Sequence, residues 1–211
     1  MPEKFASPGV IYDSGTGSTI RRGAAITNVQ AGAGVTPYGG LIVSTEGTKP
    51  TFSTGSVGFT VPATPTDVVA IYGSATRTIR VLRVVVSGTA ATAAQGIAVA
   101  LIKRSTALTG GTAVVPVTAV FDSNSPAATA SVAHYTALGT AGTSAGIVAA
   151  RTVNFPIITS AFSDRFIVDF TQNNGQALVL RGTTQGLVVN LNGVALANAT
   201  TMSYEVVWTE E

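Results

Sequence analysis

The sequence has no cysteine, a single histidine, a single tryptophan and two methionines. The lack of cysteine excludes disulfide bonds and thiolate metal sites. Only 10% of the 211 residues are charged, against about 25% in an average soluble protein. A surface so poor in charge makes a free monomer poorly soluble, so we expect neighbouring subunits to cover part of it.

Long apolar runs and concentrated positive charge are also missing. No run approaches the ~18 residues of a membrane-spanning helix, and the first residues lack the apolar core of a signal peptide, so we expect neither. The net charge is only +2. Lysine and arginine are scattered, without the basic stripe and stacking aromatics of a nucleic-acid-binding face. We therefore expect no membrane and no nucleic acid among the partners.

The residues that are abundant favour strands. Valine, isoleucine, alanine, threonine and glycine dominate, and charged residues are too few to coat the outer faces of several helices. Threonine suits the wet face of a strand. Short apolar runs separated by turn residues predict strands near 67–72, 78–87, 96–104, 114–121, 129–136, 147–156, 165–170, 177–181, 186–191 and 201–208. Their spacing predicts an all-β fold, an antiparallel two-sheet β-sandwich of jelly-roll type.

Alternation along some of these runs predicts which side chains face the core. Near the C-terminus, one side of the strand carries Met202, Tyr204, Val206 and Trp208. The preceding run alternates in the same way at Leu187, Val189 and Leu191. Residues 84–86 are apolar on both faces, which indicates a central strand or one that faces a subunit interface.

The first 55 residues differ from the rest. Nine of the 23 glycines lie in residues 1–50, and the apolar residues there come singly or in short groups. Such a segment cannot bury enough apolar area to offset its chain entropy. We expect residues 1–55 to be an extended arm or small anchoring segment that a partner completes, and residues 56–211 to be the sandwich domain.

Candidate catalytic and metal-binding residues are few. His134 lies within a strand run, and we expect a strand histidine on a wet or interfacial face, in preference to a member of a Ser-His-Asp triad. Residues 142–146 match the G-x-S-x-G pattern, but the helix that a nucleophile elbow requires does not follow. Residues 15–19 are glycine-rich without the Gly-Lys-Ser/Thr of a phosphate-binding loop. Asp122 and Asn124 offer oxygen ligands, yet a turn explains their spacing better than a calcium site.

Three arginines, Arg77, Arg80 and Arg83, recur at every third residue, so they cannot all share a face of a regular strand. We favour charges that block stray strand pairing over a surface that docks onto an acidic partner. The sequence therefore predicts no catalytic, cofactor-binding or metal-binding residue, no cofactor and no enzyme activity.

Two segments resemble a known class of proteins. One is Gly73–Ala90, followed by residues 100–107 and the turn at 122–130; the other is Leu180–Gly193 with the ending Glu205–Glu211. Together they resemble structural proteins of the virions of tailed bacteriophages and prophages. The resemblance implies a β-sandwich on the outside of the particle, commonly in homotrimers. The glycine-rich first segment resembles the anchoring arms of capsid decoration, or cement, proteins.

Three functions follow as expectations. The resemblance implies foremost a decoration protein that binds and stabilises the lattice of the major capsid protein, located in a virion assembled in the host cytoplasm. The alternative is a tail or head-fibre component that attaches to host surface glycans through exposed aromatic residues such as Tyr135. A hydrolase acting on surface polysaccharide has least support, because the acidic residues are dispersed and His134 is the single histidine.

Overall fold

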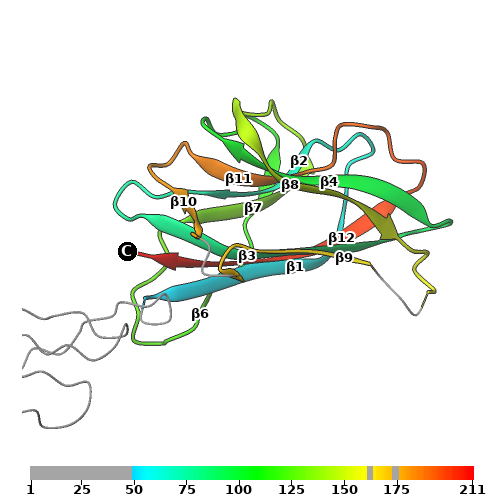
Figure 1. Ribbon diagram of the computed structural model, residues 1–211. Coiled ribbons are helices and arrows are strands. Elements are labelled where there is room, and N and C mark those ends of the chain that lie inside the picture. The colour runs from blue at the N-terminus through cyan, green and yellow to red at the C-terminus, as the bar shows by residue number, and fades with distance from the viewer. Residues whose placement is uncertain (1–48, 161–163, 173–175) are drawn as a thin grey trace, which may run out of the picture. The chain divides into compact units, whose positions relative to one another are not determined.

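The described part of the chain is built almost wholly of strands (Figure 1). A computed structural model describes residues 49–160, 164–172 and 176–211. They lie in a compact unit that spans Glu46–Glu211, while a second unit, Met1–Thr45, lies outside the described residues. The strands are β1 (Thr51–Thr60), β2 (Asp67–Tyr72), β3 (Ile79–Ala90), β4 (Gln95–Arg104), β5 (Thr112–Val114), β6 (Ala119–Val120), β7 (Ser131–Ala137), β8 (Ser144–Phe155), β9 (Arg165–Asp169), β10 (Leu178–Leu180), β11 (Gly186–Asn190) and β12 (Thr200–Glu210). The prediction of an all-β fold is confirmed.

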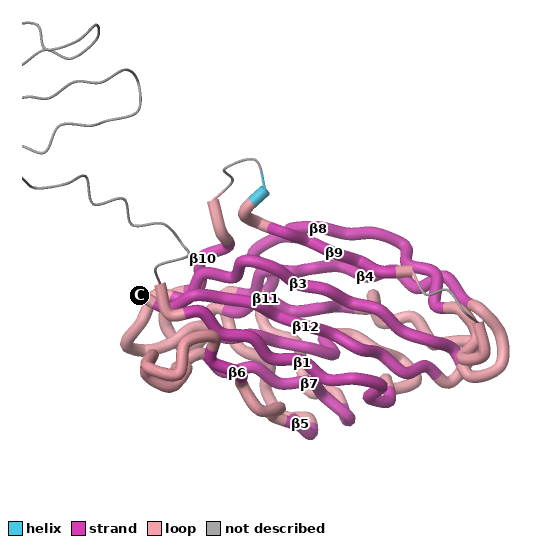
Figure 2. The backbone as a smooth tube through the Cα atoms, turned by 90° about the horizontal axis from the view of Figure 1, so that it is seen from below, coloured by secondary structure: helices cyan, strands magenta, loops and turns pink. Residues whose placement is uncertain are grey.

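These strands form two antiparallel sheets that pack face to face. Sheet A has the order β10-β3-β12-β1-β6, and β9 also pairs with β3. Sheet B has the order β5-β7-β2-β11-β4-β8. Figure 2 views the two layers from below, with β8 and β9 along one side and β5, β6 and β7 along the other. The predicted two-sheet sandwich is therefore confirmed.

The pairing has the nested pattern of a jelly roll. The first long strand pairs with the last, β1 with β12, and the second with the last but one, β2 with β11. Inside these, β3 pairs with β9 and β4 with β8. The sheets thus contain the two four-stranded cores β1-β12-β3-β9 and β2-β11-β4-β8, which is the arrangement of a double Greek key. The remaining strands, β5, β6, β7 and β10, extend the two sheets beyond these cores.

The core lies between the sheets, where the alternating side chains meet. Phe52 of β1 stacks on Trp208 of β12 with ring centroids 5.7 Å apart. The side chains predicted to face inward are all buried in this core: Leu187, Val189, Leu191, Met202, Tyr204, Val206 and Trp208. In β3, which lies inside sheet A, Val84 and Val86 are buried in the core. Burial of a large apolar side chain contributes roughly 1.5–3 kcal/mol, so this core is the main source of stability.

Strand β1 was not predicted, and a β-bulge explains why. Phe52 and Phe59 are seven residues apart, so in a regular strand they would face opposite sides. The register with β12 shifts between Ser56 and Phe59, and Gly58 in this bulge has a φ of 68°, a conformation that glycine adopts without strain. Both phenylalanines are therefore buried. The boundary predicted at residue 55 falls inside β1, and residues 1–48 of the predicted arm lie outside the described residues.

The single strand predicted at 114–121 is wrong, because this segment crosses from one sheet to the other. Its first part, β5, pairs with β7 in sheet B, and its last part, β6, pairs with β1 in sheet A. Pro116 lies between them and has no N–H to donate to a ladder. We call residues 112–121 the strap, because they connect the two sheets along one edge of the sandwich.

Candidate interaction surfaces

His134 lies inside the sandwich. Its ring contacts Phe59, with centroids 4.4 Å apart, and its Nδ1 lies 3.3 Å from the hydroxyl of Tyr204. Burial lowers the pKa of His134 and favours the neutral ring. The ring is 5% exposed and packs against Phe59 and Tyr204, so the expectation that His134 lies on a wet or interfacial face is wrong.

The G-x-S-x-G segment at 142–146 is a loop that runs into a strand. Ser144 is the first residue of β8, so the segment is followed by a strand instead of the helix that a nucleophile elbow requires. Backbone contacts hold the loop against the β4–β5 connection: the N–H of Ser105 donates to the carbonyl of Thr143, and the N–H of Thr143 donates to Thr106 Oγ1 at 2.7 Å. Its glycine Gly142 approaches the carbonyl of Thr106 too closely for any Cβ. The small residues of this loop serve close packing.

The Asp122–Asn124 segment forms a turn. The N–H of Asn124 donates to Asp122 Oδ1 at 2.9 Å, and the N–H of Ser125 donates to the carbonyl of Asp122. These bonds confirm the turn interpretation, because a short acidic side chain here accepts from its own backbone. Within the described ranges, no group of three or more potential metal-ligating side chains comes together. The glycine-rich residues 15–19 lie outside those ranges.

Two of the three regularly spaced arginines share a face after all. The register between β3 and β12 shifts so that Arg83 lies opposite Val207 while Val81 lies opposite Trp208. This bulge places Arg80 and Arg83 on the same outer face of sheet A. Arg83 donates to Glu205 at 3.0 Å, and Arg80 pairs with Glu211 at 2.5 Å. Because carboxylates of the same chain occupy both guanidinium groups, an acidic partner would have to displace them.

Arg77 differs from these two arginines. It lines an open hollow of about 250 Å³ together with hydroxyl side chains, Arg181 and Glu211. Arg181 Nη1 donates to Thr78 Oγ1 at 3.3 Å. The hollow is polar, and Glu211 supplies a carboxylate within it.

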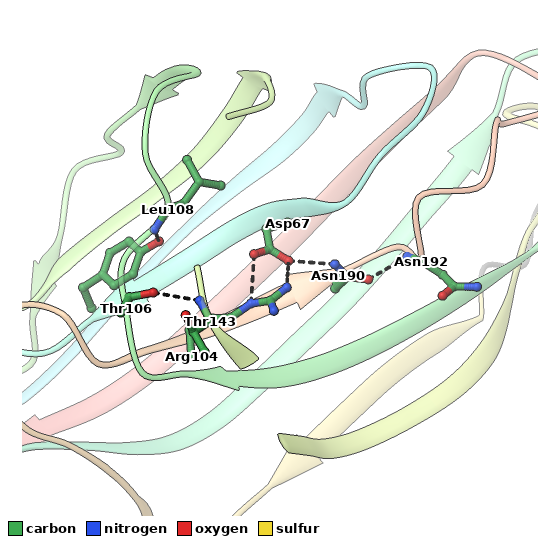
Figure 3. Close-up of polar contacts among 8 residues, drawn as sticks. Asp67, Arg104, Thr106, Leu108, Thr143, Asn190 and Asn192 are labelled. Carbon is green, nitrogen blue, oxygen red and sulfur yellow. Dashed lines mark hydrogen bonds and ion pairs between the residues drawn. The ribbon is translucent and has the colours of Figure 1, made fainter. Parts of the chain in front are cut away.

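A buried polar network ties three strands of sheet B together (Figure 3). Asp67 of β2 is fully buried. Its Oδ1 accepts from Arg104 Nη2 and from Asn190 Nδ2, each at 2.7 Å, and its Oδ2 accepts from Arg104 Nε at 3.1 Å. The charge of Asp67 is thus neutralised by a bidentate guanidinium, the geometry that makes a buried carboxylate tolerable. Asp67 bonds to both Arg104 and Asn190, so the network holds β2, β4 and β11 in register.

A second apolar cluster lies on the outer side of sheet B beside this network. It contains Ala70, Tyr72, Ala133, Tyr135 and Val188. The Tyr72 hydroxyl accepts from the N–H of Leu108 at 2.9 Å, which fixes the β4–β5 connection over the cluster. Tyr135 is only 6% exposed, so the expectation that it is an exposed aromatic is wrong. Burial, with Tyr72 and Asp67 nearby, raises the pKa of Tyr135 and keeps it protonated.

Two hollows on sheet B share Ala98 and Asn192. One, of about 280 Å³, lies under the β11–β12 connection and is lined by residues 95–98, 191–192 and 194–197. The other, of about 340 Å³, runs over Ala100, Ala150 and Thr152. Both are lined mostly by small apolar side chains, and neither contains an aromatic ring on which a sugar could stack.

Apolar side chains are exposed mainly along the two edges of the sandwich. The strap edge, made of the strap and the strand β1 that pairs with it, carries Val57, Val114, Val115, Val117, Val120 and Phe121. The β8–β9 edge, made of β8, β9 and residues 156–160, carries Ile147, Val148, Ile158 and Ile167. Val194 is the one other large hydrophobic residue exposed in the described part of the chain. Exposed apolar side chains gathered in this way mark interaction surfaces.

Local sequence patterns indicated neither of the two edges nor the Asp67 network. The strap does carry a signal, because residues 112–121 contain no charged residue and five large hydrophobic ones. A strand of this composition is usually buried inside a sheet, so the pattern alone did not indicate that these side chains are exposed. The network had no local signal, since Asp67 and Asn190 are 123 residues apart.

No helix in the described ranges is long and apolar enough to cross a membrane. Comparison of the chain with family models, with curated proteins and with solved structures finds no match.

Proposed function

We propose that this chain is a structural protein of a virion, a capsid decoration protein that binds the outside of the major capsid protein lattice and stabilises it. The observation that carries the proposal is the exposure of branched aliphatic side chains along both edges of a weakly charged sandwich. Apolar edges of this kind stabilise an assembly when another subunit covers them. They promote aggregation when they face water. A protein that works inside an assembly has them covered.

The fold supports the proposal without singling it out. Double-sheet jelly rolls occur in viral capsid and lectin domains, and one fold hosts many functions. The buried polar side chains serve the structure: His134 packs between rings, and Asp67 is held by Arg104 and Asn190. The proposed role requires a stable shape and adhesive surfaces, and it assigns no catalytic step to any residue.

Binding to capsid shells tests this role. Shells assembled from the major capsid protein encoded in the same genome are mixed with the full chain and sedimented. We expect saturable co-sedimentation and a higher melting temperature of the shells, because a ligand that binds only the folded lattice stabilises it. A chain that stays in the supernatant at all concentrations would contradict the proposal.

A truncated chain then tests the predicted arm. Because β1 begins at Thr51, the deletion has to stop at residue 48; removing residues 1–55 would also remove Phe52 from the core. We expect the chain lacking residues 1–48 to unfold at the same temperature as the full chain and to bind shells more weakly. Equal binding by the two chains would show that attachment does not need the arm.

Attachment to host glycans is the second candidate, and the surface gives it less support. Sugar recognition commonly uses exposed aromatic rings, and Phe121 is the one well-exposed aromatic side chain in the described part of the chain. A glycan array probed with the wild-type chain and with Phe121→Ala separates the candidates. Saccharide binding that Phe121→Ala abolishes would favour the glycan role, whereas an array without signal would leave the decoration role as the stronger one.

A further inference from the structure

The exposed apolar side chains are divided between two opposite edges. In sheet B the strap strand β5 is at one end and β8 at the other, and in sheet A β6 is at one end while β9 and β10 are at the other. Figure 2 shows the same separation, with β8 and β9 far from β5 and β6. The strap edge and the β8–β9 edge are therefore separate surfaces, and no single contact between two flat faces could cover both.

The chemistry of each edge fits the other. The strap has no charged residue, so a partner with charged groups at its centre would leave those groups without water or counter-charge. On the β8–β9 edge the nearest opposite charges neutralise each other, because Arg151 Nη2 lies 3.3 Å from Asp164 Oδ1. β9 also carries a charge at each end, Arg165 and Asp169. Apart from these charges, the edge presents isoleucine and valine side chains, the kind of surface that the strap's valines and Phe121 can pack against.

The strands at both edges also have a free side. β8 is twelve residues long and pairs only with β4, while β6 pairs only with β1. Free strand edges pair with other chains unless charge, proline or a covering segment prevents it. Arg151 is the one charged residue in β8. Near the end of β8, the N–H of Asn154 donates to Asp164 Oδ2 at 3.3 Å. The rest of this long, nearly uncharged edge is weakly protected against contact with another copy.

We infer that copies of this chain associate head to tail, with the strap edge of one copy against the β8–β9 edge of the next, and that the series closes into a ring. A symmetric pair built from one edge would leave the other edge exposed on both copies. A head-to-tail contact covers both edges of every copy, and such a contact gives a closed ring when its rotation closes. This inference rests on the proposed function and identifies a second copy of the chain as the partner of both edges.

Two single substitutions test the contact. Val117→Asp places a charge at the centre of the strap, and Ile147→Asp does so on β8; the side chains are 92% and 67% exposed, so the fold should tolerate both. Val194→Asp is the matched control, because Val194 is 62% exposed and lies on neither edge. Mass photometry of the full chain should give one closed species for the wild type and for Val194→Asp, and monomers for each edge variant.

Mixing the two edge variants gives the decisive result. Val117→Asp keeps an intact β8–β9 edge and Ile147→Asp keeps an intact strap, so one contact between them remains possible. We expect a one-to-one dimer in the mixture and monomers in each variant alone. A monomeric wild type, a ring that survives either edge substitution, or a mixture that stays monomeric would overturn the inference, and an open series of masses would overturn closure.

Two further measures separate a misfolded variant and a failed proposed function from a failed contact. If an unfolding curve shows that an edge variant is not folded, Val115→Asp or Ile167→Asp replaces it, since both positions are more than half exposed on the same edges. Ring formation is measured without capsid shells. A ring that does not bind shells contradicts the proposed function alone, and shell binding by a monomeric wild type contradicts this inference alone.

Discussion

Replacing Glu210 with glutamine tests whether a buried carboxylate holds the segment that follows the strap. Glu210, in β12, is 1% exposed. Its Oε1 accepts from the N–H of Thr129 at 2.9 Å, from the N–H of Ala130 at 3.0 Å and from Trp208 Nε1 at 3.0 Å, while its Oε2 accepts from the hydroxyl of Thr129 at 2.7 Å. These bonds fasten the connection between the strap and β7 to the C-terminal strand.

The expected cost follows from the loss of charge on these bonds. A hydrogen bond to a charged group contributes about 1.5–3 kcal/mol, against about 0.5–1.5 kcal/mol for a neutral one. In Glu210→Gln the carbonyl oxygen can keep three N–H donors, each weakened by about 1 kcal/mol, and the hydroxyl of Thr129 has to turn and accept. We expect the free energy of unfolding to fall by about 3 kcal/mol, from the same hydrogen-bond values. At about 2–4 °C per kcal/mol, the melting temperature should fall by roughly 6–12 °C.

Urea unfolding followed by the fluorescence of Trp208 measures this cost, because Trp208 is the single tryptophan and contacts Glu210. The neighbouring Glu211→Gln is the control. Glu211 pairs with Lys49 and Arg80 at a partly exposed position, so its loss should cost less than about 1 kcal/mol. A cost below about 1 kcal/mol for Glu210→Gln would refute the reasoning.

The same variant has a defined pH dependence. Burial alone would raise the pKa of Glu210, but the hydrogen bonds from Thr129, Trp208 and Ala130 outweigh it and lower the pKa from 4.5. A folded-state pKa below the unfolded one gives stability that is fully present above pH 4.5 and is lost as the pH falls through the folded pKa. The difference in unfolding free energy between the wild type and Glu210→Gln should therefore shrink in acid. A constant difference would contradict the charge-based account.

Three further changes probe the rest of the structure by thermal or urea unfolding. Arg104→Ala leaves the buried charge of Asp67 without its partner and should lower the free energy of unfolding by about 3–5 kcal/mol. Its control, Arg83→Ala, breaks an exposed pair and should lower it by less than about 1 kcal/mol. Equal losses would contradict the role of the network. The lowered pKa of His134 makes stability fall as the pH drops below 6.5, its unfolded value, towards the lower folded one, and His134→Gln should remove this dependence. Gly88→Ala forces a Cβ against the ring of Phe155 in β8 and against the backbone carbonyl of Thr201, and it should cost about 1–3 kcal/mol. An unchanged melting temperature would contradict this close packing.

Most of the strands could be predicted because their signals are local. The run at 67–72 coincides with β2, and the alternation in residues 202–208 placed Trp208 and its inward-facing companions correctly. Turn residues between these runs bounded them within a few positions. Such patterns reflect the two-residue period of a strand and need no knowledge of its neighbours.

The failures occur where the period breaks or where tertiary contacts decide. The bulge at Gly58 changes the parity of β1, and Pro116 divides the strap between two sheets. A bulge between Arg80 and Arg83 likewise put on one face two residues that a regular strand separates. No local pattern carries this information, because a bulge is fixed by pairing with a distant strand.

The interaction surfaces were the least predictable part. An uncharged run such as the strap has the composition of a buried strand, and only its crossing between the sheets leaves Val117 exposed. The low charge of the whole chain predicts that neighbouring subunits cover part of the surface, and this stays a prediction. The sequence could not say where that surface lies, since both edges exist only after the sandwich has closed.

The solution mass of the full-length wild-type chain, measured from nanomolar to micromolar concentration, tests the central claim most directly. The account predicts one closed species whose mass is the same integral multiple of the chain mass throughout the upper part of that range. A chain that remains monomeric at micromolar concentration, with Val117 and Ile147 exposed to water, would contradict the claim that this sandwich works through covered edges.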